Sequence, residues 1–157
     1  MPVISRSAEI AALYQELILD HYRRPRNKGE LAGATTSVIM MNPLCGDEVA
    51  LHVLLEGDTI ADLRFSGRGC SISQASASMM TQLVKGKSAE EIEELRGTFR
   101  NMVMGTTPAD DEAASAALGS LRALSGVCRF PARVKCALLA WNALESAIEG
   151  ARASQSG

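Results

Sequence analysis

The sequence lacks a net positive charge, a long apolar run and a secretory signal. Its formal charge of -2 and its isoelectric point near 5.7 leave no overall basic field for wrapping a phosphate backbone, so no nucleic-acid partner is expected. No stretch approaches the roughly 20 apolar residues of a membrane-spanning helix. The first residues, MPVISRSAEI, also lack the apolar run of a signal peptide. These absences predict a cytoplasmic protein that does not enter a membrane.

Internal repeats and linker-like breaks in composition are absent as well. A chain of 157 residues is about the size of one ordinary domain, and its 46% of apolar residues can build one core. We therefore expect a single domain over 1–157, with a frayed tail over 151–157.

Cysteine occurs four times. Thiols stay unpaired in the reducing cytoplasm, so these cysteines are interpreted as metal ligands, nucleophiles or core residues rather than as disulfides. The question is which of them take part in chemistry.

The first half of the chain carries the alternating pattern of a β-hairpin. Apolar residues occupy the odd-numbered positions of 48–56 and of 61–65, and the Gly57-Asp58 pair between these segments can turn. We expect the odd-numbered positions of each segment to share a face, and 37–41 to add a third strand.

Apolar residues at helical spacing predict helices before and after these strands. Cys70 would lie at the N-terminus of one helix, and Cys136 in the second turn of the last helix. Early strands followed by helices predict an α+β fold, a small three-stranded antiparallel sheet packed against helices on one side. The expected helices are 9–22, 70–86, a short one after Ser88, 114–124 and one that begins at Pro131.

Four candidate metal ligands lie in three segments of the chain. In Cys45-Gly46-Asp47 the glycine lets a thiolate and a carboxylate face one point. Behind a Gly-x-Gly sequence, a helix N-terminus favours the thiolate form of Cys70. If Cys136 lies beside them, three sulfurs and one oxygen suit tetrahedral Zn²⁺. The residues alone leave buried or incidental roles equally open, because ligands this far apart in sequence do not define a site by their spacing.

Cations flank these positions in the sequence. Three thiolates and a carboxylate around Zn²⁺ have a net negative charge, which favours nearby cations. We expect Arg68, Arg133 and Lys135 to lie around the site without binding the metal.

Four segments resemble one protein family in the same order along the chain. They are LILDHYRRPRN, NPLCGDE, SGRGCSISQASASMM and FPARVKCALLAW. Over nearly the whole chain they resemble the SufU branch of the IscU/NifU-type iron–sulfur cluster assembly proteins. The resemblance implies an IscU/SufU-like fold, with metal ligands at Cys45, Asp47, Cys70 and Cys136.

Two features resemble the SufU branch rather than the IscU branch. Lys135 stands immediately before the last cysteine, where IscU-like scaffolds have a histidine, so a cation replaces an imidazole ligand. The stretch 105–124 resembles the insertion of SufU-like proteins, and FPARV replaces the chaperone-recognition motif of IscU-like proteins.

The SufU resemblance implies a zinc-dependent sulfur acceptor, or sulfurtransferase, for iron–sulfur cluster assembly. Its partners would be a SufS-type PLP-dependent cysteine desulfurase and a downstream iron–sulfur scaffold. In that branch, docking exchanges a metal ligand and frees the first cysteine, here Cys45, to accept persulfide sulfur. Asp47 would hold the metal while Cys45 is away.

Two other functions use the same residues. A scaffold could assemble a [2Fe–2S] cluster, or bind iron, on three cysteines and an aspartate. A purely structural zinc would instead have ligands closed to exchange. Cys128 matches no motif and is expected to be a structural or incidental thiol, and His21 is expected to pack or contact a partner rather than catalyse.

Overall fold

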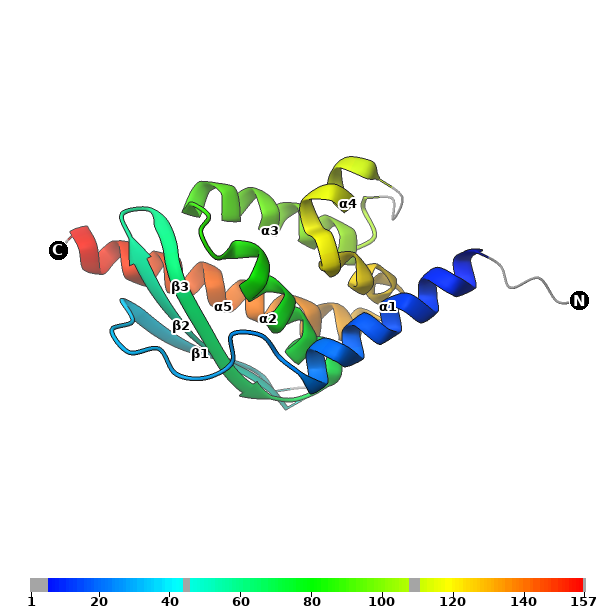
Figure 1. Ribbon diagram of the computed structural model, residues 1–157, viewed down its shortest axis with the longest axis horizontal. Helices are drawn as coiled ribbons and strands as arrows, with labels where there is room; N and C mark the ends of the chain where they lie inside the picture. The colour runs from blue at the N-terminus through cyan, green and yellow to red at the C-terminus, as the bar shows by residue number, and fades with distance from the viewer. Residues whose placement is uncertain (1–5, 44–45, 108–110, 157) are drawn as a thin grey trace, which may run out of the picture.

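The structure, a computed structural model, describes residues 6–43, 46–107 and 111–156 (Figure 1). It has the predicted α+β fold: one antiparallel sheet of three strands in the order β1-β2-β3, with helices packed against it. The elements are α1 (Arg6–Arg23), β1 (Thr36–Asn42), β2 (Asp47–Glu56), β3 (Thr59–Arg68), α2 (Ser71–Val84), α3 (Ala89–Val103), α4 (Glu112–Leu118), the 3-10 helix η1 (Gly119–Arg129) and α5 (Pro131–Ser156).

One face of the sheet is apolar and covered by helices. Val49, Leu51 and Val53 of β2 are fully buried on this face, where α5 packs on β1 and β2 while α2 packs on β3. Figure 1 shows α2 and α5 running side by side along the sheet. The opposite face exposes Ile39 and Met41 of β1. The predicted packing on one side is therefore confirmed.

The hairpin register contains an irregularity that the sequence pattern did not predict. Leu54 pairs with Asp62 while Leu55 pairs with Ile60, so Ala61 is an extra residue, as in a β-bulge. Ile60 is fully buried in consequence, and Ala61 is not. The expected buried face was wrong at Ala61 and correct farther along β3.

Helix α2 passes through the middle of the molecule and contacts α1, α5 and the sheet. Its residues from Ser73 to Thr81 are all buried, and the buried serines are hydrogen-bonded rather than left unpaired. Ser76 Oγ donates to the Ala137 carbonyl of α5 at 2.7 Å. The helix that follows Cys70 is thus packed against the helix that contains Cys136.

Helix α1 is attached to α2 by a buried polar contact. His21 Nδ1 lies 2.7 Å from Ser78 Oγ, which also accepts the Arg26 amide at 2.8 Å. His21 is only 4% exposed, which confirms that it packs rather than faces solvent. Leu13, one of the apolar residues of this helix, is 53% exposed.

The segment after α3 differs in part from the sequence prediction. Ser88 and Glu91 form a capping box at the start of α3, which is a full 15-residue helix rather than the short one expected after Ser88. The helix expected over 114–124 is interrupted because Gly119, with φ of 55°, ends α4 and the chain continues as a 3-10 helix.

Helix α5 begins at Pro131 as predicted and extends for 26 residues to Ser156. The expected frayed tail is therefore wrong for 151–156, and Gly157 lies outside the described residues. Ala151 is fully buried, and Arg152 of the next position forms an ion pair with Asp58 at 2.7 Å. Within the described chain, no helix has the length and apolarity needed to cross a membrane.

Candidate metal centre

Three of the four predicted ligands come together from three different elements. Asp47 is the first residue of β2, Cys70 is the N-cap of α2, and Cys136 lies in the second turn of α5. One ligand atom of each lies within 4.8 Å of the others. Asp47 and Cys136 are buried and Cys70 is partly buried. The fourth predicted ligand, Cys45, lies outside the described residues.

The carboxylate of Asp47 is oriented by the backbone that enters α2. The Cys70 amide donates to Asp47 Oδ1 at 2.8 Å, while Oδ2 lies 3.7 Å from Cys70 Sγ. Gly69 makes this approach possible, because a Cβ at that position would overlap Asp47 Oδ1. One carboxylate oxygen is thereby held by the protein, and the other faces the sulfurs.

The spacing of these atoms fits zinc. In a tetrahedral site with Zn–S near 2.3 Å and Zn–O near 2.1 Å, a sulfur and an oxygen ligand are about 3.6 Å apart. The observed separation of Cys70 Sγ and Asp47 Oδ2 is 3.7 Å. Two thiolates and a carboxylate from these residues would therefore hold zinc as three ligands of one tetrahedron, and zinc would keep the thiolates deprotonated.

The surroundings of Asp47 lower its pKa and so favour the ionised carboxylate. Burial alone would raise the pKa of Asp47, but hydrogen bonds from the Cys136 thiol, the Cys70 amide and thiol, and Ser73 together lower it below the usual range. A carboxylate that stays charged when buried is available to a cation.

Two buried polar residues of α2 support the cluster, and sequence reasoning missed both. The Ser73 hydroxyl donates to the Cys70 carbonyl at 3.1 Å, and its amide donates to Cys70 Sγ at 3.5 Å. Gln74 Nε2 in turn lies 3.2 Å from Ser73 Oγ. Their position three and four residues after Cys70, in the first turn of a predicted helix, was the signal that could have identified them.

The three flanking cations differ in their relation to the cluster. Attraction to Cys70, a hydrogen bond to it and attraction to Cys136 raise the pKa of Arg133, which lines the same groove as Cys70. Arg68 and Lys135 are exposed, and within the described part of the chain neither forms an ion pair. Of the three cations, Arg133 is therefore the one for which an interaction with the cluster sulfurs is found among the described residues.

An open groove leads from Cys70 across the surface. It has a volume of about 650 Å³ and is lined by apolar side chains together with Arg129 and Arg133. Phe130, next to the predicted helix start, is 62% exposed at this groove. Cys128 is also exposed but is not part of the cluster.

The sequence matches a known family over most of its length. The profile described as the NifU-like N terminal domain matches residues 13–155. Among curated proteins, the zinc-dependent sulfurtransferase SufU of Bacillus subtilis is 47% identical over 145 residues, which are 92% of this chain and 95% of that protein.

Proteins named as scaffolds are similar too. The iron–sulfur cluster assembly scaffold protein IscU of Streptococcus pyogenes is 46% identical over 138 residues, covering 87% of this chain and 83% of that protein. A crystal structure from Fervidobacterium islandicum, of a candidate assembly scaffold for the SUF system, superposes with a TM-score of 0.78 at 36% identity. It covers 87% of this chain and 97% of that one.

Proposed function

Because the chain belongs to the NifU-like N-terminal domain family, we propose that it is a zinc-dependent sulfur acceptor for iron–sulfur cluster assembly. Its ligands would be Cys45, Asp47, Cys70 and Cys136, and Cys45 would accept the sulfur. The donor would be a SufS-type PLP-dependent cysteine desulfurase, and the sulfur would pass to a downstream scaffold in the cytoplasm.

The observation that carries this proposal is the composition of the buried cluster. Asp47, Cys70 and Cys136 converge within 4.8 Å, and neither histidine of the chain belongs to the cluster. His21 instead contacts Ser78, and His52 contacts Ser37 on the sheet. A set of thiolates and one carboxylate suits zinc. The SufU relative, whose name specifies zinc dependence, supports the same metal.

The transfer requires a nucleophilic thiolate and a donor persulfide. The Cys45 thiolate would attack the terminal sulfur of the donor's persulfide. A new S–S bond forms at Cys45, the donor's own S–S bond breaks, and the donor cysteine leaves as a thiolate. Arg133, beside Cys70 and Cys136, would attract the anionic persulfide toward the cluster.

The alternative is a scaffold that assembles a [2Fe–2S] cluster on the same residues. The similarity to proteins named as IscU scaffolds supports it, and Cys₃Asp ligation is acceptable for such a cluster. The exposed Lys135 in place of a histidine ligand favours the sulfur acceptor.

Metal analysis combined with a desulfurase assay tests the proposal. We expect about one zinc per chain, and faster sulfide or alanine production by the desulfurase when the protein is present. Cys45→Ala should abolish that stimulation, whereas Cys128→Ala, an exposed cysteine outside the cluster, should retain it. Bound iron and sulfide without stimulation would overturn the proposal in favour of the scaffold.

A further inference from the structure

Two hollows lie at adjacent residues of the chain, one lined by Cys70 and the other by Gly69. The larger is the groove beside Cys70, which contains Arg129 and Arg133. The smaller, of about 290 Å³, lies between the end of α1 and the turn from β3 into α2. Its lining consists of Tyr22, Pro25, Lys28, Gly67, Arg68, Gly69 and Gln74. A molecule that docks over the cluster would cover both hollows.

Both hollows contain basic side chains: Arg129 and Arg133 in the larger one, where Arg133 also interacts with the cluster sulfurs, and Lys28 and Arg68 in the smaller one. No acidic side chain lines either of them among the described residues. In the same part of the chain, neither Lys28 nor Arg68 lies within ion-pair distance of a carboxylate, although Glu48 faces Arg68 across the strands. Lys28 and Arg68 of the small hollow are therefore available to an external anion.

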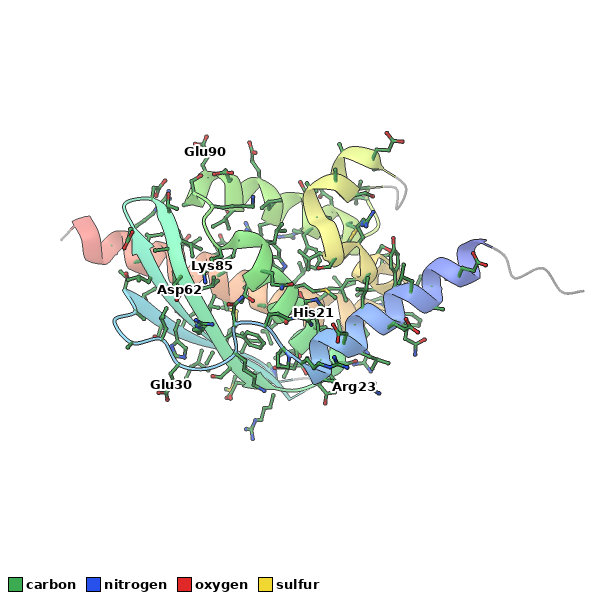
Figure 2. The ribbon with its side chains drawn as sticks, in the orientation of Figure 1. His21, Arg23, Glu30, Asp62, Lys85 and Glu90 are labelled. Carbon is green, nitrogen blue, oxygen red and sulfur yellow. The ribbon has the colours of Figure 1, made fainter. Side chains whose placement is uncertain are left out.

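An acidic hollow lies at the opposite end of the molecule. Its volume is about 550 Å³, it is lined by five acidic residues, and its two arginines are already paired with acids. It lies at the β2–β3 turn, and the ten residues of β3, roughly 30 Å long, separate it from the cationic hollows. Figure 2 shows Glu90 at this end and Arg23 at the end of α1, close to the start of α2.

We propose that the cationic end docks an acidic surface of the sulfur donor, with one donor carboxylate entering the small hollow between Lys28 and Arg68. This inference rests on the proposed function and names the surface that the donor recognises. Opposite charges across an interface speed encounter and fix register. A carboxylate held at Arg68 would set the donor over the adjacent Cys70, where its persulfide faces the cluster.

Docking of the zinc-loaded protein to the desulfurase tests this directly, by titration at low and at physiological salt. We expect the pair Lys28→Glu and Arg68→Glu to weaken binding by about tenfold or more and to flatten its salt dependence. The matched control makes the same charge change at Lys87→Glu and Arg100→Glu, which line neither hollow, and should bind within about twofold of the parent.

Zinc content and thermal midpoint of each variant show whether the fold is retained. If the reversed pair loses zinc, Lys28→Gln with Arg68→Gln is measured instead and must still weaken docking. Equal affinity of the hollow and control variants would overturn the inference, as would wild-type docking that is insensitive to salt. Tight binding of inorganic phosphate that leaves docking unchanged would overturn it too, by indicating a small-anion site.

The result separates this inference from the proposed function. A wild-type protein that accepts sulfur while the reversed pair docks normally contradicts the docking surface alone. A wild-type protein that accepts no sulfur contradicts the proposed function.

Discussion

The position of the Asp47 carboxylate depends on a hydrogen bond from the Cys70 amide and on the lack of a side chain at Gly69. The Cys70 amide holds Oδ1, and Gly69 leaves the space in which that oxygen lies. Outer contacts of this kind orient a ligand before the metal arrives, so that less ordering remains to be done on binding.

Gly69→Ala should therefore weaken zinc retention by about tenfold to a hundredfold, measured by competition with a chromophoric chelator. The new Cβ would displace the Asp47 carboxylate from the sulfurs. Gly86→Ala is the matched control, because Gly86 also has positive φ but has open space around it. Equal zinc loss in the two variants would show that backbone strain, and not the contact with Asp47, is responsible.

His21 links pH to stability. Burial lowers the pKa of His21, Arg26 lowers it further, and Asp20 only partly opposes them. The unfolded chain therefore binds a proton more readily than the folded one, so His21's contribution is complete above about pH 6.5 and is lost as the pH falls below it.

Denaturant unfolding of the metal-free protein between about pH 7.5 and 5.5 measures this effect without interference from ligand protonation. The wild type should lose more stability over this range than His21→Gln, which keeps a polar group able to hydrogen-bond Ser78 but does not titrate. Identical pH slopes in the two proteins would contradict a neutral, buried His21.

At the scale of elements, hydrophobic periodicity was sufficient to predict the sheet and most helices. Each of these elements buries one apolar face, and the spacing of apolar residues along the sequence reflects that burial. It could not locate the extra residue at Ala61, since a bulge depends on pairing between strands rather than on the pattern of one strand. Nor did it detect that Gly119 would end α4, because a glycine inside an Ala-rich run is compatible with either outcome.

The end of α5 was mispredicted for a related reason. Small polar residues at a terminus are typical of a frayed tail. Here Ala151 is fully buried, which the sequence alone does not indicate, and Gly150 lies close to Thr36 of β1. Docking against the sheet therefore extends the helix.

Ala151→Glu should lower the free energy of unfolding by about 3 kcal/mol, because it buries a charge without a partner. Asn142→Glu places the same charge on an exposed position of α5 and should change it by less than about 0.5 kcal/mol. Chemical denaturation of both variants is the measurement. A loss at Ala151 no larger than at Asn142 would mean that this part of α5 does not pack.

At the scale of the whole molecule, the cluster joins the sheet, α2 and α5 at one end of the fold. The residues alone could not establish that convergence, since Asp47, Cys70 and Cys136 are far apart in sequence and meet only through tertiary packing. The resemblance to a family supplied it, and the structure brings these three together.

Zinc should consequently stabilise the fold as a whole. A metal that binds only the native state adds about 4 kcal/mol to the free energy of unfolding when its free concentration is about 1,000 times its dissociation constant. Chelation should then lower the thermal midpoint by about 10 °C in a domain of this size, and added zinc should restore it. Cys136→Ala should show no zinc-dependent shift. A midpoint that does not respond to chelation in the wild type would contradict a metal shared by three elements.

The central claim, that Cys45 accepts sulfur while Asp47, Cys70 and Cys136 hold the metal, is tested most directly by locating the transferred sulfur. The protein is incubated with a cysteine desulfurase and cysteine, and its peptides are analysed by mass spectrometry. We predict one added sulfur atom on the peptide that contains Cys45, and none on any peptide of the Cys45→Ala variant. Sulfur on Cys70 or Cys136, or undiminished loading of Cys45→Ala, would contradict the account.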